Sequence, residues 1–368
     1  MYQNKKKGGW KRGVVITLAI VLVLVLLVVG GVALYVNHLL NQIKRPDDTA
    51  QNTLSTEQVE QILQSGGEME DGFVFVPQEE PELEHEMITD VADAVNTGSD
   101  IINILLIGSD WRKGQSWELS DTMILCTINK ETRTLTFTSF MRDMYVKLPD
   151  YNGMTCGYNR INCCYALGGM DMLDQCLLEN FGVNVDHNVA VNFYNFSTIV
   201  DLLGGVDIEM TAYEASHLNQ YYGGSLREGM NHLNGELALS YARLRSIDSD
   251  FNRTSRQRTV LTAMVNSVRS LSLPELIAMV NEVVPLITTD MTNSEILDYV
   301  IELAPLLRDL TIDSLRIPAD GSYYGAVKGS AEYPMHVLVP DLDESRELLR
   351  SVLGETAVEE TEETTAND

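Results

Sequence analysis

Residues 101–108 read IINILLIG, and this run decides the fold class. The run is apolar almost throughout and ends in glycine, which is typical of a β-strand that is buried on both faces. Further strands are expected at 122–128, 134–140, 188–191, 206–210 and 311–317. Helical periodicity recurs at 170–180, 193–203, 236–241, 255–268, 274–287 and 294–307. This order of elements predicts an α/β domain in which helices sandwich a mixed central β-sheet.

Residues 13–36, upstream of this domain, contain no charged side chain. A helix needs about 20 such residues to cross the hydrocarbon core of a membrane. Five Lys and Arg residues and no acid precede the run, and basic flanks of this kind stay on the cytoplasmic side. A cleaved signal peptide is the alternative, but its apolar region would span only about 7 to 15 residues and end in small residues. We therefore predict one N-terminal transmembrane helix in the cell membrane, with the N-terminus cytoplasmic and the domain extracellular.

The rest of the chain divides by composition. Residues 1–12 form the cytoplasmic tail, and residues 37–99, rich in Glu, Asp, Gln and Thr, are expected to form an acidic extracellular stalk. The main domain is expected at 100–320, with a C-terminal extension at 321–354. Residues 355–368 are acidic and lack apolar periodicity, which predicts a disordered tail.

The charge of the exported part limits its partners. The formal net charge is -27, although residues 1–45 hold seven basic residues and no acid. Nucleic acid is therefore not an expected partner, because phosphate neutralisation needs a broad basic surface. The five cysteines show neither a CxxC motif nor a metal-ligand spacing. Disulfides and buried free thiols both remain open for them.

Two aspartates flank the ends of the first two predicted strands. Asp110 follows the first strand and Asp121 precedes the second. Ligands of such sheets gather at strand ends, and the two carboxylates would face each other if the strands are antiparallel neighbours. Mg2+ takes one or two protein carboxylates and completes its shell with water and substrate phosphates. The alternative is that each Asp only caps a turn.

Arginines cluster further along the chain. Arg243, Arg245, Arg253, Arg256 and Arg258 lie within sixteen residues of an acidic domain, and such a cluster indicates an anion ligand. The first two would share one face of an extended segment, whereas Arg253, Arg256 and Gln257 would share a helix face. Arg258 would point elsewhere, as a solvated or structural arginine. Arginine forks match phosphate oxygens, so pyrophosphate is the expected anion. Surface pairing with Asp248 and Asp250 is the alternative.

Several motifs together resemble the LytR-CpsA-Psr wall-polymer ligases. They are NILLIGSDWR (103–112), SDTMILCTIN (120–129), FMRDMYVKLP (140–149), NRINCCYALGG (159–169), IVDLLGGVDIEM (199–210), HLNGELALSYARLR (232–245) and DFNRTSRQR (250–258). The resemblance implies transfer of a glycopolymer, such as a teichoic acid or capsular polysaccharide, from a polyprenyl-pyrophosphate carrier to a sugar hydroxyl of peptidoglycan. The lipid bilayer and peptidoglycan are then the partners of the chain.

The resemblance also implies roles for particular residues. Asp110 and Asp121 would hold Mg2+, for which Mn2+ is a substitute. The pyrophosphate would be bound by Arg142, Arg160, Arg243, Arg245, Arg253 and Gln257, and the catalytic residues would be Arg142, Arg243, Arg245 and Asp250. Leu119 stands where many members have an arginine, and Arg160 where the family often has lysine.

Phosphoryl transfer depends mainly on positioning and charge neutralisation. The absence of a Ser/His/Asp triad therefore does not argue against an enzyme, whereas the absence of GxSxG, HExxH and P-loop motifs argues against a serine hydrolase, a zinc protease and a nucleotide-triphosphate enzyme. Two alternatives remain: a polyprenyl-pyrophosphate hydrolase that uses water as acceptor, and a non-catalytic protein that binds the lipid-linked glycan.

Overall fold

A computed structural model describes residues 44–46, 54–65, 86–109, 118–244, 250–329 and 334–354. The predicted transmembrane helix at 13–36 and the predicted disordered tail at 355–368 lie outside these residues. Within the described ranges, no helix has the length and apolar character required to cross a bilayer.

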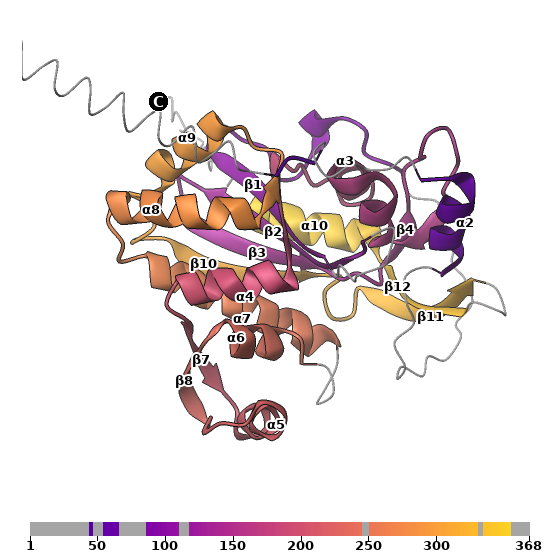
Figure 1. Ribbon diagram of the computed structural model, residues 1–368. Coiled ribbons are helices and arrows are strands. Elements are labelled where there is room, and N and C mark those ends of the chain that lie inside the picture. Colours follow the sequence, from indigo (N-terminus) through magenta and orange to yellow (C-terminus); the bar gives the residue numbers. More distant parts are fainter. Residues whose placement is uncertain are drawn as a thin grey trace, which may run out of the picture.

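A six-stranded sheet in the order β10-β3-β2-β1-β6-β9 forms the centre of the domain (Figure 1). Its strands are β1 (Ile101–Ser109), β2 (Ser120–Asn129), β3 (Thr134–Phe140), β6 (His187–Asn192), β9 (Thr288–Thr289) and β10 (Thr311–Ile317). Strand β1 pairs antiparallel with β2 and parallel with β6, and β10 pairs parallel with β3. The sheet is therefore mixed, as predicted from the sequence.

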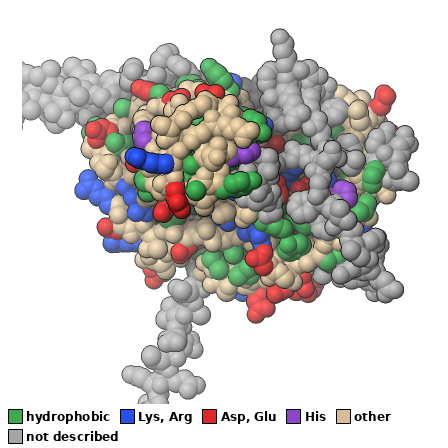
Figure 2. Space-filling model, turned by 90° about the horizontal axis from the view of Figure 1, so that it is seen from below, with side chains coloured by type: hydrophobic (Ala, Val, Ile, Leu, Met, Phe, Trp, Pro, Cys, Tyr) green, Lys and Arg blue, Asp and Glu red, His purple; other side chains and the backbone are tan. Residues whose placement is uncertain are grey.

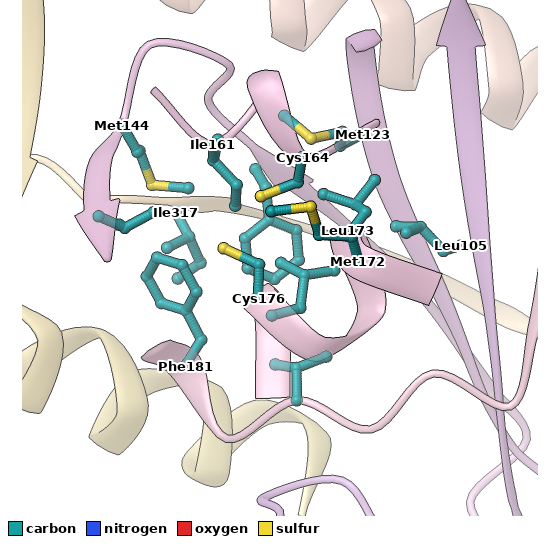
Figure 3. Packing of buried hydrophobic residues seen from close by; sticks show 14 of the residues in the cluster. Leu105, Met123, Met144, Ile161, Cys164, Met172, Leu173, Cys176, Phe181 and Ile317 are labelled. Carbon is teal, nitrogen blue, oxygen red and sulfur yellow. The ribbon is translucent and has the colours of Figure 1, made fainter. Parts of the chain in front are cut away.

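Alternate side chains of the strands enter two separate cores. Leu105 and Met123 belong to the core beneath α3 (Cys163–Phe181) and α10 (Leu342–Leu353). Figure 3 shows the packing of this core, including Leu173 of α3. Ile102 and Ile124 belong to the opposite core, which contacts α7 (Asp250–Val268) and α9 (Asn293–Leu303). Burial on both faces explains why the first strand is a continuous apolar run.

The remaining helices and strands extend this sandwich. The helices are α4 (Phe193–Leu202), α5 (Ala212–Tyr222), α6 (Gly235–Ala242) and α8 (Leu273–Val283). Three two-stranded ribbons pair β4 (Tyr145–Lys147) with β5 (Tyr158–Arg160), β7 (Val206–Met210) with β8 (Gly229–Leu233), and β11 (Tyr323–Gly329) with β12 (Pro334–Pro340). The β7–β8 ribbon and α5 project from the sheet below α6 and α7 (Figure 1). Helix α3 kinks at Gly168 and at Gly169, whose φ of 65° favours glycine.

Part of the segment expected to be a stalk belongs to the domain. Helix α2 (Thr56–Ser65) buries Val59 and Ile62 in the same core as α3, and Val95 joins them. Arg45 donates a hydrogen bond of 2.7 Å to Asn293 Oδ1 at the start of α9. The polar composition hid this docking, because α2 has only a short apolar stripe, in which Val59 and Ile62 are buried and Leu63 is partly buried against the same core.

The five cysteines are free thiols, and only Cys156 is not fully buried. Cys163, Cys164 and Cys176 lie within the α3 core, where Figure 3 shows the last two. Burial raises the pKa of Cys163 to about 12, which keeps its thiol protonated and unreactive at neutral pH. These cysteines therefore act as small apolar core residues.

Candidate active site

A row of alternating charges lies beyond the ends of β2 and β3. Arg142, in the turn after β3, is ion-paired through Nη1 with Asp121 of β2. Arg142 Nε lies 3.6 Å from Asp143 Oδ2, and Arg160 Nε of β5 lies 3.5 Å from Asp143 Oδ1. The side chains of both arginines are largely buried. The structure thus brings together three residues that the sequence placed in the site: Asp121, Arg142 and Arg160.

The surrounding acids hold Arg142 in its charged form. Burial by itself lowers the pKa of a guanidinium, but Asp143, Asp121 and Asp250 outweigh it and raise the pKa of Arg142 above its ordinary value. Asp250 is the first residue of α7, so this electrostatic contribution also shows that the helix begins beside the charge row.

Helix α7 presents two further predicted residues to the same region. Arg253 is 3% exposed, and its Nη2 donates a 2.9 Å hydrogen bond to Asp250 Oδ2. One turn later, Gln257 Nε2 donates a 3.0 Å hydrogen bond to Thr122 Oγ1, next to Asp121. Positions 253 and 257 share a helix face, as predicted, and this face meets the ends of the strands. The ion pair of Arg253 with Asp250 is buried. It therefore differs from the solvated surface pairing that was the alternative for this cluster.

The structure describes only one of the two aspartates that were predicted to bind the metal. Asp110 lies outside the described residues, but the antiparallel pairing on which its proximity to Asp121 depended is present. The register joins Ser109, the last residue of β1, to Ser120, and Gly108 to Thr122. Gly108 is required there, because a Cβ would approach Thr122 Cβ to 2.9 Å. Among described residues, no group of three His, Cys, Asp or Glu side chains has metal-binding geometry.

Arg243 and Arg256 lie differently from the prediction, whereas Arg258 agrees with the structural one of its two alternatives. Arg243 is the exposed C-cap residue of α6, not part of an extended segment, and its guanidinium carbon lies 4.1 Å from the Phe193 ring centroid. Arg256 points away from Arg253 and Gln257, because its Nε donates to Glu214 of α5 at 2.7 Å. Arg258 is half-buried, not solvated, and reaches Ser139 of β3. Arg245 lies outside the described residues.

Sequence reasoning did not assign a role to Asp143, the acid that links Arg142 to Arg160. Its position directly after Arg142 is a signal that it lies near the site. An Arg-Asp dipeptide alone, however, does not show that the Asp also contacts an arginine on another strand. Thr122, the acceptor of Gln257, was likewise read only as the start of a strand.

Known proteins with similar sequences share this architecture. Residues 76–339 match the LytR_cpsA_psr family. The polyisoprenyl-teichoic acid–peptidoglycan teichoic acid transferase TagT of Bacillus subtilis is 33% identical over 182 residues, which cover 48% of this chain and 55% of that protein. TagU of Oceanobacillus iheyensis, which carries the same transferase name, is 30% identical over 279 residues, or 73% of each chain.

A solved structure of TagT bound to LIIa-WTA has a TM-score of 0.55 at 25% identity and covers 69% of this chain and 91% of that chain. The chain spans about half the length of TagT of Bacillus subtilis, the relative with the higher identity. The family match nevertheless extends through every strand of the central sheet and through the whole charge row. The chain therefore belongs to the LytR_cpsA_psr family.

Proposed function

We propose that this protein is a membrane-anchored phosphotransferase, which moves a glycopolymer from a polyprenyl-pyrophosphate carrier to a sugar hydroxyl of peptidoglycan. The observation that carries the proposal is the charge row of Asp121, Arg142, Asp143 and Arg160, with Asp250 and Arg253 beside it. Buried, charged arginine forks at strand ends provide the fixed positive charges that a pyrophosphate requires. The names of TagT and TagU support teichoic acid as the polymer and peptidoglycan as the acceptor.

The reaction exchanges one phosphorus–oxygen bond for another. The acceptor hydroxyl oxygen attacks the phosphorus on the sugar side, and the bond from this phosphorus to the bridging oxygen breaks. The lipid phosphate leaves with the bridging oxygen, and the hydroxyl proton passes to solvent or to this phosphate. Arg142 and Arg160 would stabilise the charge that develops on the phosphate oxygens, while Arg253 would orient the donor. These roles need no covalent enzyme intermediate.

Some of the acidic residues near the charge row fit a divalent cation, and others do not. Asp121 provides one carboxylate at the end of β2, and Asp110 would provide the second from the chain that follows β1. Mg2+, or Mn2+ in its place, would be held by these two carboxylates and would supply positive charge to neutralise the pyrophosphate. Asp143 and Asp250 remain engaged with arginines, so their role is to position these arginines.

Partly buried apolar side chains support a lipid carrier. Leu261 and Val265 of α7 and Leu303 of α9 are only partly buried against the core that includes Ile124 and Phe137. A prenyl chain that covers such side chains would gain roughly 25 cal/mol for each Å2 of apolar surface removed from water.

Product analysis tests the proposal. The purified full-length protein, incubated with Mg2+, a polyprenyl-pyrophosphate glycan and peptidoglycan oligomers, should yield polymer joined to the oligomers through a phosphodiester. Free polymer phosphate that forms equally well without peptidoglycan would identify a hydrolase instead. Tight donor binding without any product would identify a non-catalytic binding protein.

The proposed topology follows from the apolar run at 13–36 and its basic flank. Protease added to intact cells should digest the chain from residue 37 onward. Protection of the domain, while a control protein on the outer surface is cut, would reverse the orientation.

A further inference from the structure

Arg258 of α7 has no carboxylate partner in the described part of the chain. Its Nη1 donates a 2.8 Å hydrogen bond to Ser139 Oγ of β3, and its buried Nε has no hydrogen-bond acceptor among the described residues. The neighbouring Arg316 of β10, by contrast, donates to Pro318 O at 3.0 Å and pairs with Asp320. A half-buried guanidinium with one neutral partner has N–H donors left for a ligand.

The electrostatic surroundings of Arg258 also favour an anion as its partner. Burial and the positive charge of Arg316 lower the pKa of Arg258 to about 10. The side chain therefore still carries its charge at neutral pH, without an ion pair among the described residues. An anion from outside the chain would relieve both the repulsion and the missing hydrogen bond.

A cavity of about 240 Å3 lies beside Arg258, between α7, β7 and β10. Hydroxyl and amide side chains form much of its wall: Ser255, Thr259, Thr262, Asn266 and Ser314. Asp207 and Glu209 of β7 complete the polar lining, and Asp207 Oδ1 already lies 2.8 Å from His232 Nδ1. Arg258 is the only basic side chain among the described residues that line the cavity.

The cavity is separate from the charge row, because none of the residues of that row lines it. Because Asp207 and Glu209 also line the cavity, it disfavours a pyrophosphate more strongly than a phosphodiester, whose charge is half as large. The hydroxyl and amide groups match an alditol or sugar on either side of the phosphate. Seen from the side of α5 (Figure 2), basic side chains stand in separate patches among acidic and uncharged ones. A polyanion would thus meet isolated cationic positions on this face.

We propose that this cavity binds one phosphodiester of the glycopolymer backbone, with Arg258 as the partner of the phosphate. This inference rests on the proposed function, since it assumes a polymer donor. The site would select polymers that carry phosphate along their backbone. Arg258 would then determine specificity for the polymer, in a role distinct from that of the arginines at the pyrophosphate.

Binding of soluble probes tests this site without any transfer reaction. The probes are a lipid-free glycerol phosphate oligomer and inorganic pyrophosphate with Mg2+, each titrated calorimetrically into the full-length protein. Arg258→Gln should weaken oligomer binding by roughly tenfold to a hundredfold, the loss expected for a charge-assisted hydrogen bond. Pyrophosphate binding should change by less than about threefold, because Arg258 lines a cavity that no residue of the charge row enters.

Two further variants complete the test. Arg308→Gln, which removes an exposed arginine, should leave both affinities unchanged. Asn266→Asp adds a negative charge to the cavity at an exposed position and should weaken oligomer binding by at least about threefold, even if Arg258→Gln does not fold.

Equal losses for both probes in Arg258→Gln would place Arg258 at the pyrophosphate and overturn the proposal. Unchanged oligomer binding in Arg258→Gln or Asn266→Asp would overturn it as well. Failure of the proposed transfer would be seen separately, as an absence of product in the peptidoglycan assay while these affinities remain measurable.

Discussion

Replacement of Arg142 by glutamine is expected to slow polymer transfer by roughly a hundredfold or more, the usual effect of removing one electrostatic stabiliser from an active site. Arg142 is the central cation of the charge row, where Asp121 and Asp143 contact it and Asp250 helps to keep it charged. Glutamine carries no charge, so the substitution removes the positive charge that would face the leaving lipid phosphate. It also leaves two carboxylates facing a polyanion. Initial rates at saturating donor measure the effect on the reaction itself.

Stability must be separated from catalysis in this experiment, because breaking a largely buried ion pair destabilises a fold. Rates should therefore be compared well below the melting temperature of each variant. Arg142→Lys should fall between wild type and Arg142→Gln, since it keeps the charge and loses the planar fork. Arg133→Gln, which breaks an exposed pair of 3.3 Å with Asp309, should retain the wild-type rate within about twofold. A folded Arg142→Gln variant with a nearly normal rate would exclude Arg142 from the reaction.

Asp110→Ala is expected to abolish transfer. Asp110 follows β1 directly, and the register of β1 with β2 pairs Ser109 with Ser120, the residue before Asp121. If both carboxylates hold Mg2+, loss of one removes the cation that would offset the pyrophosphate charge. Excess chelator should have the same effect on the wild-type protein, and added Mg2+ or Mn2+ should reverse it.

The matched control lies at the other end of the same strand. Asp100 is exposed and directly precedes Ile101, the first residue of β1, so Asp100→Ala should transfer at the normal rate. Full activity of Asp110→Ala, or of the wild type in excess chelator, would contradict the metal assignment.

Local patterns in the sequence were sufficient for much of the fold. The bounds predicted for β3, β7 and β10 agree with the structure, because these strands end where apolar alternation gives way to turn residues. Helix α10 was missed, although Asp341 caps its N-terminus and its apolar residues follow a helical period. Helix α5 was also not predicted, because its sequence has a capping box of Thr211 and Glu214 but little amphipathic pattern.

The sequence by itself also proposed a set of site residues through its motifs, and the structure brings six of them into one region: Asp121, Arg142, Arg160, Asp250, Arg253 and Gln257. Only the tertiary structure decided what each arginine of α7 does. Periodicity tells which side chains share a helix face, but not which element covers that face. Helix α7 lies between the sheet and the α5 region, so Arg256 is neutralised by Glu214 of α5 while Arg258 faces Ser139 of the sheet without an acid. Neighbouring residues of one charge thus differ in their surroundings because the side chains that contact them come from distant parts of the chain.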